Sequence, residues 1–238
     1  EAVMPGGNTR TVLHTSPFPI RAARAQGNRI TDIDGHSYLD LLGEYSAGIY
    51  GHSHPDIRAA VADALAGGLN YGAPHESEVA FAETVAGRFA LDLVRFTNSG
   101  TEANMMALAA ARCFTSRARI MPMFGGYHGG TLYFSAGASP VNAPFDVVLG
   151  HYNDVARTSA LIAEHGEKLA AIILEPMLGG GGCIPADAAF VKMLREESER
   201  RGIVLIFDEV MTSRLAPGGL SSLLGIEPDL KTLGKYIG

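Results

Sequence analysis

Short apolar runs alternate with stretches of helical periodicity along most of the chain after residue 55. Apolar runs of this length are typical of strands buried on both faces, and apolar residues repeated every three or four positions indicate helices. The predicted strands are residues 93–97, 119–124, 146–149, 171–174, 203–207 and 230–233. The predicted helices are residues 55–65, 76–89, 101–113, 155–165 and 187–201. This alternation predicts an α/β fold with a mostly parallel central sheet that is covered on both faces.

The first part of the chain has a different pattern. Residues 1–28 contain proline and glycine at irregular intervals and predict irregular structure. Residues 29–42 predict two short strands around Asp34-Gly35, a dipeptide typical of hairpin turns. His54-Pro55 then precedes the first predicted helix, and proline is well tolerated in a first helical turn.

Composition and charge narrow the class of protein. The 238 residues are 47% hydrophobic and 18% charged, which is typical of a packed globular protein. The net charge of −6, without a basic stretch to offset it, argues against nucleic-acid binding. No apolar run is long enough for a membrane span, and the N-terminus does not resemble a signal peptide. The two cysteines fit neither a disulfide framework nor a zinc site, so we expect a reducing, cytoplasmic setting.

Polar residues that could bind a ligand or take part in catalysis follow four of the predicted strands. In parallel sheets covered by helices, ligands bind at the carboxyl ends of the strands. The residues placed there by the pattern are Ser99, Tyr127, Glu175 and Asp208. This shared placement predicts a binding site at one edge of the sheet.

Ser99-Gly100-Thr101 stands at a predicted strand-to-helix turn. A glycine at such a turn lets backbone N–H groups approach a phosphate, and the positive end of the following helix favours an anion. The hydroxyls of Ser99 and Thr101 add further donors. Ser99 and Glu102 also have the spacing of a capping box, which any helix can use. Phosphate binding and helix capping are therefore both predicted, and they are compatible with each other.

A glycine-rich loop, residues 125–130, carries Tyr127 and His128. The tyrosine ring can stack on a flat cofactor, and the glycines allow the backbone to approach closely. The alternative is a surface loop with a partly buried tyrosine. We expect His128 to play a supporting role, and Glu175 to support a ring hydroxyl or a water molecule.

Asp208 and Lys235 complete the candidate chemistry. A carboxylate such as Asp208 can bind a protonated pyridine nitrogen and raise its pKa, which makes the ring an electron sink. Lys235, among apolar and glycine neighbours, can act as nucleophile and base. The alternative for Asp208 is an acid at a strand end that interacts with a helix N-terminus. The alternative for Lys235 is a solvated surface lysine. Taken together, an acid, a later lysine and a phosphate-binding turn are the parts needed to hold pyridoxal 5′-phosphate.

These motifs resemble those of the class III aminotransferases, which use pyridoxal 5′-phosphate on the aspartate-aminotransferase type of fold (fold type I). The matching segments occur in the family's order and are residues 98–104, 126–129, 175–176, 208–210 and 234–235. The resemblance implies that Ser99, Gly100 and Thr101 hold the phosphate. It further implies that Tyr127 stacks on the ring, Val210 packs under it, Asp208 pairs with its nitrogen and Lys235 forms the Schiff base.

Within this family, residues 8–13, 17–19 and 211–217 are similar to the β-amino acid (β-phenylalanine) aminotransferases. The neighbouring branch is the glutamate-1-semialdehyde aminomutases. In the first branch Arg10 would bind the substrate carboxylate, for which a planar guanidinium is well suited. The alternative for Arg10 is a surface arginine on the N-terminal segment.

The resemblance to the family implies a homodimer that transfers an amino group from an amino acid to a keto acid such as 2-oxoglutarate or pyruvate. The resemblance to the first branch implies that the donor is a β-amino acid. An aminomutase, which needs no external acceptor, and a non-catalytic fragment of the fold are the alternatives. Family members continue beyond the lysine. We therefore expect residues 1–50 to belong to the small domain and residues 51–238 to form an incomplete large domain, with the C-terminal small domain absent from this chain.

Overall fold

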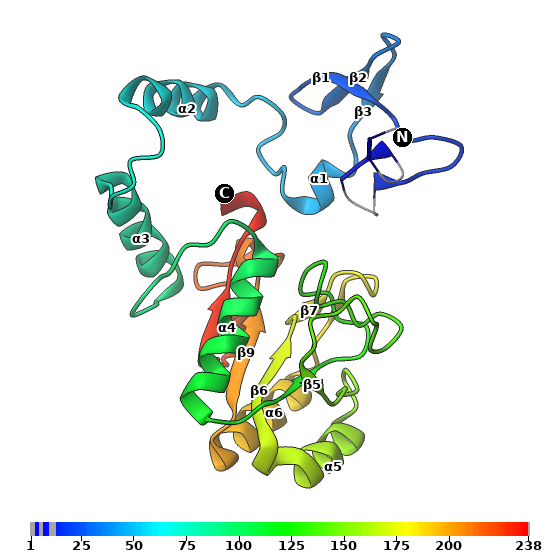
Figure 1. Cartoon of the computed structure of the whole chain (residues 1–238), viewed down its shortest axis with the longest axis vertical. Helices are drawn as coiled ribbons and strands as arrows, with labels where there is room; N and C mark the ends of the chain where they lie inside the picture. The colour runs from blue at the N-terminus through cyan, green and yellow to red at the C-terminus, as the bar shows by residue number, and fades with distance from the viewer. Residues whose placement is uncertain (1–2, 5–6, 10–12, 238) are drawn as a thin grey trace. The chain divides into compact units, whose positions relative to one another are not determined.

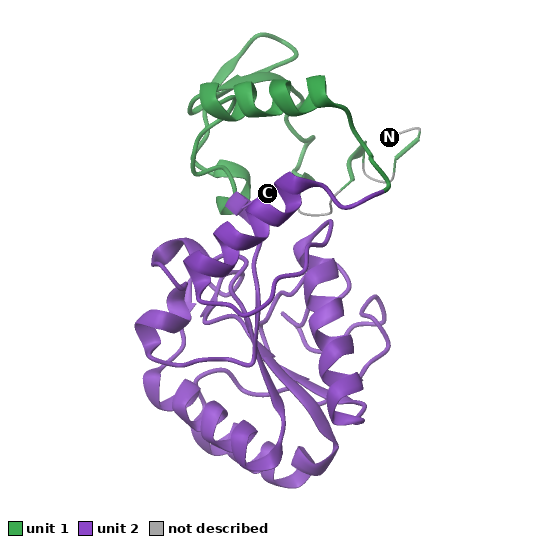
Figure 2. Cartoon of the chain, turned by 90° about the vertical axis from the view of Figure 1, so that its left-hand side faces the viewer, with its two compact units in different colours: residues 1–72 green, residues 73–238 purple. Residues whose placement is uncertain are grey.

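The computed structural model describes residues 3–4, 7–9 and 13–237. The chain forms two compact units, residues 1–72 and residues 73–238 (Figure 2). The predicted division at residue 50 concerns the small and large domains of a complete enzyme, and it stays a prediction.

The first unit is built around a three-stranded antiparallel sheet in the order β1-β2-β3. Gly27 and Asn28 form the turn between the first two strands, and Gln26 pairs with Arg29 across it. The elements of this unit are β1 (Ala22–Gln26), β2 (Arg29–Asp32), β3 (Ser37–Leu39), α1 (Gly43–Ser46) and α2 (Pro55–Gly67). The hairpin predicted within residues 29–42 is confirmed. The prediction of irregular structure up to residue 28 is wrong for β1, whose alanine-rich sequence has little strand propensity but follows the register set by this turn.

The second unit contains a five-stranded sheet in the order β10-β9-β6-β4-β5, in which all pairs are parallel. Its helices are α3 (Glu76–Phe89), α4 (Gly100–Thr115), α5 (Val155–His165), α6 (Ala188–Arg201) and α7 (Leu220–Leu224). The sheet strands are β4 (Arg119–Pro122), β5 (Asp146–Val147), β6 (Leu169–Leu174), β9 (Val204–Asp208) and β10 (Leu230–Thr232). A separate two-stranded ribbon pairs β7 (Met177–Leu178) with β8 (Ile184–Pro185).

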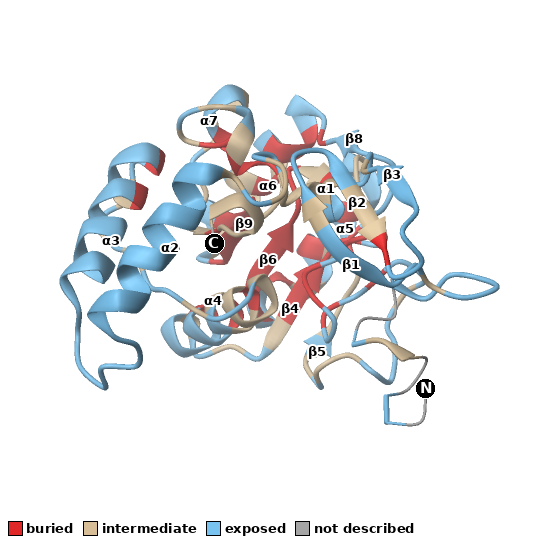
Figure 3. Ribbon diagram, turned by 90° about the horizontal axis from the view of Figure 1, so that it is seen from above, coloured by how far each residue is buried: buried red, intermediate tan, exposed pale blue. Residues whose placement is uncertain are grey.

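The central sheet lies between α4 on one side and α5 and α6 on the other (Figure 1), and alternate residues of each strand face opposite layers. On one face, Ile172 and Leu205 pack in a core to which α5 and α6 contribute Ile162 and Phe190. On the other face, strand residues pack against Leu108 of α4 and its neighbours. The strands β4, β6 and β9 are consequently the most buried part of the unit (Figure 3). The predicted parallel sheet with helices on both faces is confirmed.

One predicted strand is wrong. Residues 93–97 form no strand in the structure, because no described strand pairs with them. Leu93 is 91% exposed, so this apolar side chain is not buried in this chain.

Among the described residues, no helix has both the length and the apolar character that a membrane span requires.

Candidate active site

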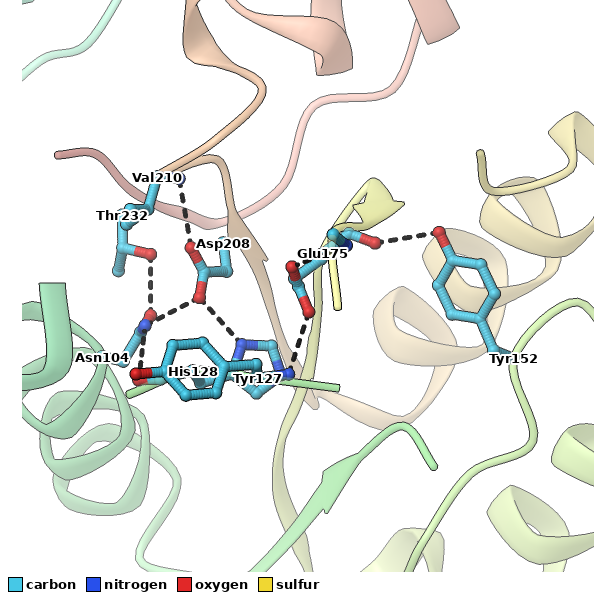
Figure 4. A network of polar contacts seen from close by, with 9 residues as sticks. Asn104, Tyr127, His128, Tyr152, Glu175, Asp208, Val210 and Thr232 are labelled. Atoms are coloured by element: carbon cyan, nitrogen blue, oxygen red, sulfur yellow. Dashed lines mark hydrogen bonds and ion pairs between the residues drawn. The ribbon is translucent and has the colours of Figure 1, made fainter. Parts of the chain in front are cut away.

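Asp208 is the last residue of β9 and lies on the α4 face of the sheet, since Val204 and Ile206 of the same strand pack there. Its side chain is buried and accepts three hydrogen bonds (Figure 4). His128 Nδ1 lies 2.8 Å and Asn104 Nδ2 2.7 Å from Oδ2, and the Val210 backbone N–H lies 3.1 Å from Oδ1. These partners come from α4, from a loop and from the turn after β9, so the alternative of an acid that meets a helix N-terminus is wrong.

Ser99 is the N-cap of α4, and its Oγ accepts a hydrogen bond from the Glu102 N–H at 3.1 Å. The Glu102 carboxylate in turn accepts a bond of 2.8 Å from the backbone N–H of Asn98. The capping function is thus confirmed, with the return bond made to the residue before Ser99. The N–H groups of Gly100 and Thr101 lie in the first turn of α4, where backbone N–H groups have no partner within the helix, and they remain suited to an anion. Phosphate binding by Ser99, Gly100 and Thr101 stays a prediction.

Close packing brings the separate motifs together at this end of the sheet. Val210 lies between two glycines: a Cβ atom added to Gly100 would be 3.2 Å from Val210 Cγ2, and one added to Gly234 would be 3.4 Å from Val210 Cγ1. The start of α4, the turn after β9 and the segment that carries Lys235 therefore meet around one small side chain. The loop that carries Tyr127 reaches the same place, because Gly129 packs directly against Thr101.

We expect Gly129→Ala to lower the free energy of unfolding by about 2 kcal/mol or more. Gly129 has a φ of 122°, and an added Cβ atom would lie 2.2 Å from Thr101 Oγ1. Gly130→Ala is the matched control, because nothing lies within 4 Å of an added Cβ atom there. Urea unfolding of both variants measures the difference, and equal stabilities would contradict the close contact.

Tyr127 and Glu175 are joined through the backbone. The Tyr127 N–H donates to Glu175 Oε1 at 2.9 Å, and the Gly179 N–H donates to Oε2 at 3.1 Å. The Tyr127 ring is 46% exposed and meets Tyr133 edge to face, with 5.2 Å between centroids. The tyrosine is therefore partly exposed, while the buried Glu175 carboxylate holds the backbone of its loop (Figure 4).

Burial raises the pKa of the Glu175 carboxyl above its usual range, and the Asp208 carboxylate raises it further. His128 and the hydrogen bonds from the Tyr127 and Gly179 N–H groups lower this pKa, but they do not outweigh the effect of burial. A raised pKa in the folded state means that the protonated form favours folding more than the ionised form does. The stability contributed by protonated Glu175 is therefore fully present below the ordinary glutamate pKa of about 4.3 and is lost as the pH rises through the raised value.

We accordingly expect the free energy of unfolding, relative to that of Glu175→Gln, to fall as the pH rises through this window. The fall should be about 1.4 kcal/mol for each unit by which the pKa is raised. Urea unfolding at a series of pH values measures it, with Glu167→Gln, at an exposed glutamate, as the control. A difference that is constant or increases with pH would contradict the raised pKa.

Lys235 follows the glycine that packs on Val210 and begins a single 3₁₀ turn, Lys235–Ile237. Its φ is 60°, in the left-handed region where a residue with a side chain costs roughly 1 kcal/mol or more. Backbone strain of this kind is concentrated at functional sites. Arg10, the predicted ligand of the substrate carboxylate, lies outside the described residues.

Sequence reasoning assigned no role to two buried residues at the site, Asn104, which lies in the matched segment 98–104, and Thr232. Asn104 occupies the same face of α4 as the buried Leu108, where an apolar residue is expected. That polar interruption was the signal available in the sequence. Glu209, next to Asp208, is also buried but accepts bonds from the N–H groups of Leu220 and Ser221, so it anchors α7 and serves the fold.

Comparison with known proteins gives a consistent result. A family model for the class III aminotransferases matches residues 12–238. The β-phenylalanine transaminase of Variovorax paradoxus is 51% identical over 236 residues, which cover 99% of this chain and 54% of that protein. Its crystal structure gives a TM-score of 0.96 at 50% identity, covering 99% of this chain and 55% of that one.

Two further similarities are informative. The glutamate-1-semialdehyde 2,1-aminomutase of Thermoplasma acidophilum is 38% identical over 254 residues, which cover 100% of this chain and 60% of that protein. A solved structure of a transaminase with PLP bound gives a TM-score of 0.91 at 35% identity, covering 98% of this chain and 58% of that one. The chain thus spans just over half the length of these relatives, and the predicted fold type is confirmed. The match over nearly all of its residues shows that this chain belongs to the class III aminotransferase family.

Proposed function

We propose that the protein containing this chain is a pyridoxal 5′-phosphate-dependent transaminase that moves an amino group from an amino acid, of the β type, to a keto acid such as 2-oxoglutarate or pyruvate. The observation that carries the proposal is the meeting of Asp208, Val210 and Gly234-Lys235 at the carboxyl end of the sheet. The cofactor, when bound, supplies an electron sink for the substrate carbon that loses a proton.

The residues present fit this cofactor. The N–H groups at the start of α4 suit its phosphate, and the half-exposed ring of Tyr127 suits its flat ring. Asp208 supplies a buried carboxylate for the pyridine nitrogen, and both side chains that bind Oδ2 are hydrogen-bond donors. His128 and Glu175 support the cofactor indirectly, through Asp208 and through the Tyr127 backbone. Val210 would pack against the ring.

Proton movement is the task of Lys235 in this proposal. Its Nζ would take the proton from the substrate carbon that bears the amino group and would hold it for later return. The cofactor, when bound, would carry the amino group, and water would supply the oxygen of the keto product. Asp208 would keep its negative charge at the ring nitrogen throughout. A fixed charge that needs no reorganisation during the reaction is an effective source of catalysis.

The preference for a β-amino acid is supported by the 51% identity with a β-phenylalanine transaminase. In this proposal Arg10 binds the substrate carboxylate, for which a planar guanidinium is well suited. Aminomutase activity is the second candidate, since a glutamate-1-semialdehyde aminomutase is 38% identical over the whole chain. The two reactions differ in that only the transaminase requires an external keto acid.

The experiment is an assay of the purified, pyridoxal phosphate-loaded protein with β-phenylalanine or glutamate-1-semialdehyde as the substrate. We expect turnover of β-phenylalanine that depends on added 2-oxoglutarate or pyruvate. Turnover of the semialdehyde without a keto acid would support the aminomutase instead. Cofactor binding without turnover of either substrate would contradict both activities.

A further inference from the structure

Asn104 makes hydrogen bonds to three separate parts of the candidate site (Figure 4). Its side-chain Nδ2 lies 3.0 Å from the His128 carbonyl oxygen and 2.7 Å from Asp208 Oδ2. Thr232, the last residue of β10, places its Oγ1 2.7 Å from Asn104 Oδ1. Asn104 is only 1% exposed, so these groups replace water as its partners.

The partners determine which way the amide is oriented. The carbonyl oxygen of His128 can only accept, so the atom next to it must be the amide nitrogen. The same nitrogen then donates to Asp208 Oδ2, and the amide oxygen accepts the hydroxyl proton of Thr232. A reversed amide would place its oxygen against both a carbonyl and a carboxylate, and neither contact would be a hydrogen bond.

The position on α4 argues against a role in packing alone. The next residues on this face, Leu108 and Ala111, are buried and apolar, and they pack against strand residues. An amide in such surroundings is unfavourable unless its hydrogen bonds are satisfied. Two of the three groups that satisfy it are the Asp208 carboxylate and the backbone of the loop that carries Tyr127.

We propose that Asn104 is a positioning residue, which fixes the carboxylate of Asp208 and ties the loop of Tyr127 and His128 to α4, and that Thr232 holds its amide in the required orientation. The inference rests on the proposed function, because Asp208 is positioned for the cofactor ring. Asn104 touches Asp208 and not the reacting atoms, so its removal should weaken the cofactor site without abolishing the chemistry.

Three variants test this role. Asn104→Leu removes the amide at similar size, and Thr232→Val removes only the hydroxyl that orients it. Thr115→Val is the matched control, because Thr115 lies at the other end of α4, where its hydroxyl donates to the Ala111 carbonyl and accepts from the Arg117 N–H. For each protein, three quantities are measured: the dissociation constant for pyridoxal phosphate, the pH dependence of the visible absorption of the loaded protein, and the thermal unfolding of the cofactor-free protein.

We expect Asn104→Leu to weaken pyridoxal phosphate binding roughly tenfold and to shift the pH profile of the absorption, because the carboxylate loses a charge-assisted hydrogen bond. Thr232→Val should act in the same direction, about threefold, and Thr115→Val should leave both quantities unchanged. A lower unfolding temperature with an unchanged dissociation constant and pH profile, in both site variants, would overturn the inference.

The outcomes also separate the inference from the proposed function. Pyridoxal phosphate binding by the wild-type protein without turnover of any amine would remove the proposed transaminase activity but leave the effect of Asn104 on binding measurable. Failure of the wild-type protein to bind pyridoxal phosphate would overturn both proposals, since Asp208 would then have no cofactor to meet.

Discussion

We expect replacement of Lys235 with alanine to lower the proposed turnover of β-phenylalanine by at least about a thousandfold, because in the proposed function one side chain supplies both the nucleophile and the base. Lys235 directly follows Gly234, which packs on Val210. Val210 in turn lies two residues after Asp208. The backbone of Lys235 thus lies close to the turn that follows the buried carboxylate. Steady-state assays with saturating pyridoxal phosphate measure the loss.

The control for this variant is Lys192→Ala. Lys192 lies on α6 with its side chain exposed, and its ion pair with Glu196 on the same helix is worth little. It should keep wild-type turnover, and both variants should have the circular dichroism of the wild-type protein. Borohydride reduction of the loaded wild-type protein, followed by peptide mass spectrometry, should locate the cofactor on Lys235. Normal turnover by Lys235→Ala would contradict the assignment.

Much of the second unit could be predicted from the sequence because its elements depend on local periodicity. The helix predicted over residues 155–165 is observed at those bounds, and the strands around Ile172 and Leu205 occur where apolar runs predicted them. The strand ends then placed Glu175 and Asp208 at one edge of the sheet without knowledge of the strand order. Parallel strands share a direction, so their carboxyl ends meet whatever the order is.

Other features depend on contacts that periodicity does not encode. Residues 93–97 have the composition of a strand, but a strand also needs a hydrogen-bonding neighbour, and none of the described strands provides one. The partners of Asn104 are distant in sequence, and one of them is the hydroxyl of Thr232. Side-chain packing also brings Thr101 against Gly129, which no spacing rule predicts. The sequence thus predicts a set of candidate site residues, but it does not predict the hydrogen bonds that connect them.

Replacing Asp208 with alanine is expected to have two large effects. Loss of the carboxylate leaves the buried donor groups of His128 and Asn104 without their shared acceptor, so the free energy of unfolding should fall by about 3 kcal/mol. Loss of the charge beside the cofactor ring should lower turnover by at least about a hundredfold. Urea unfolding of the cofactor-free protein and steady-state assays of the loaded protein measure the two effects separately.

Asp208→Asn distinguishes the charge from the hydrogen bonds. The amide keeps the size of the side chain and one acceptor atom, so it should restore part of the stability that alanine loses, but it carries no charge and turnover should stay low. Asp146→Ala is the control, since Asp146 forms an exposed ion pair with Arg119 at the other end of the sheet. If Asp208→Asn had normal turnover, the carboxylate would be needed only for folding. If Asp208→Ala were as stable as the control, the buried network around Asn104 and His128 would not contribute to folding in the way that its geometry indicates.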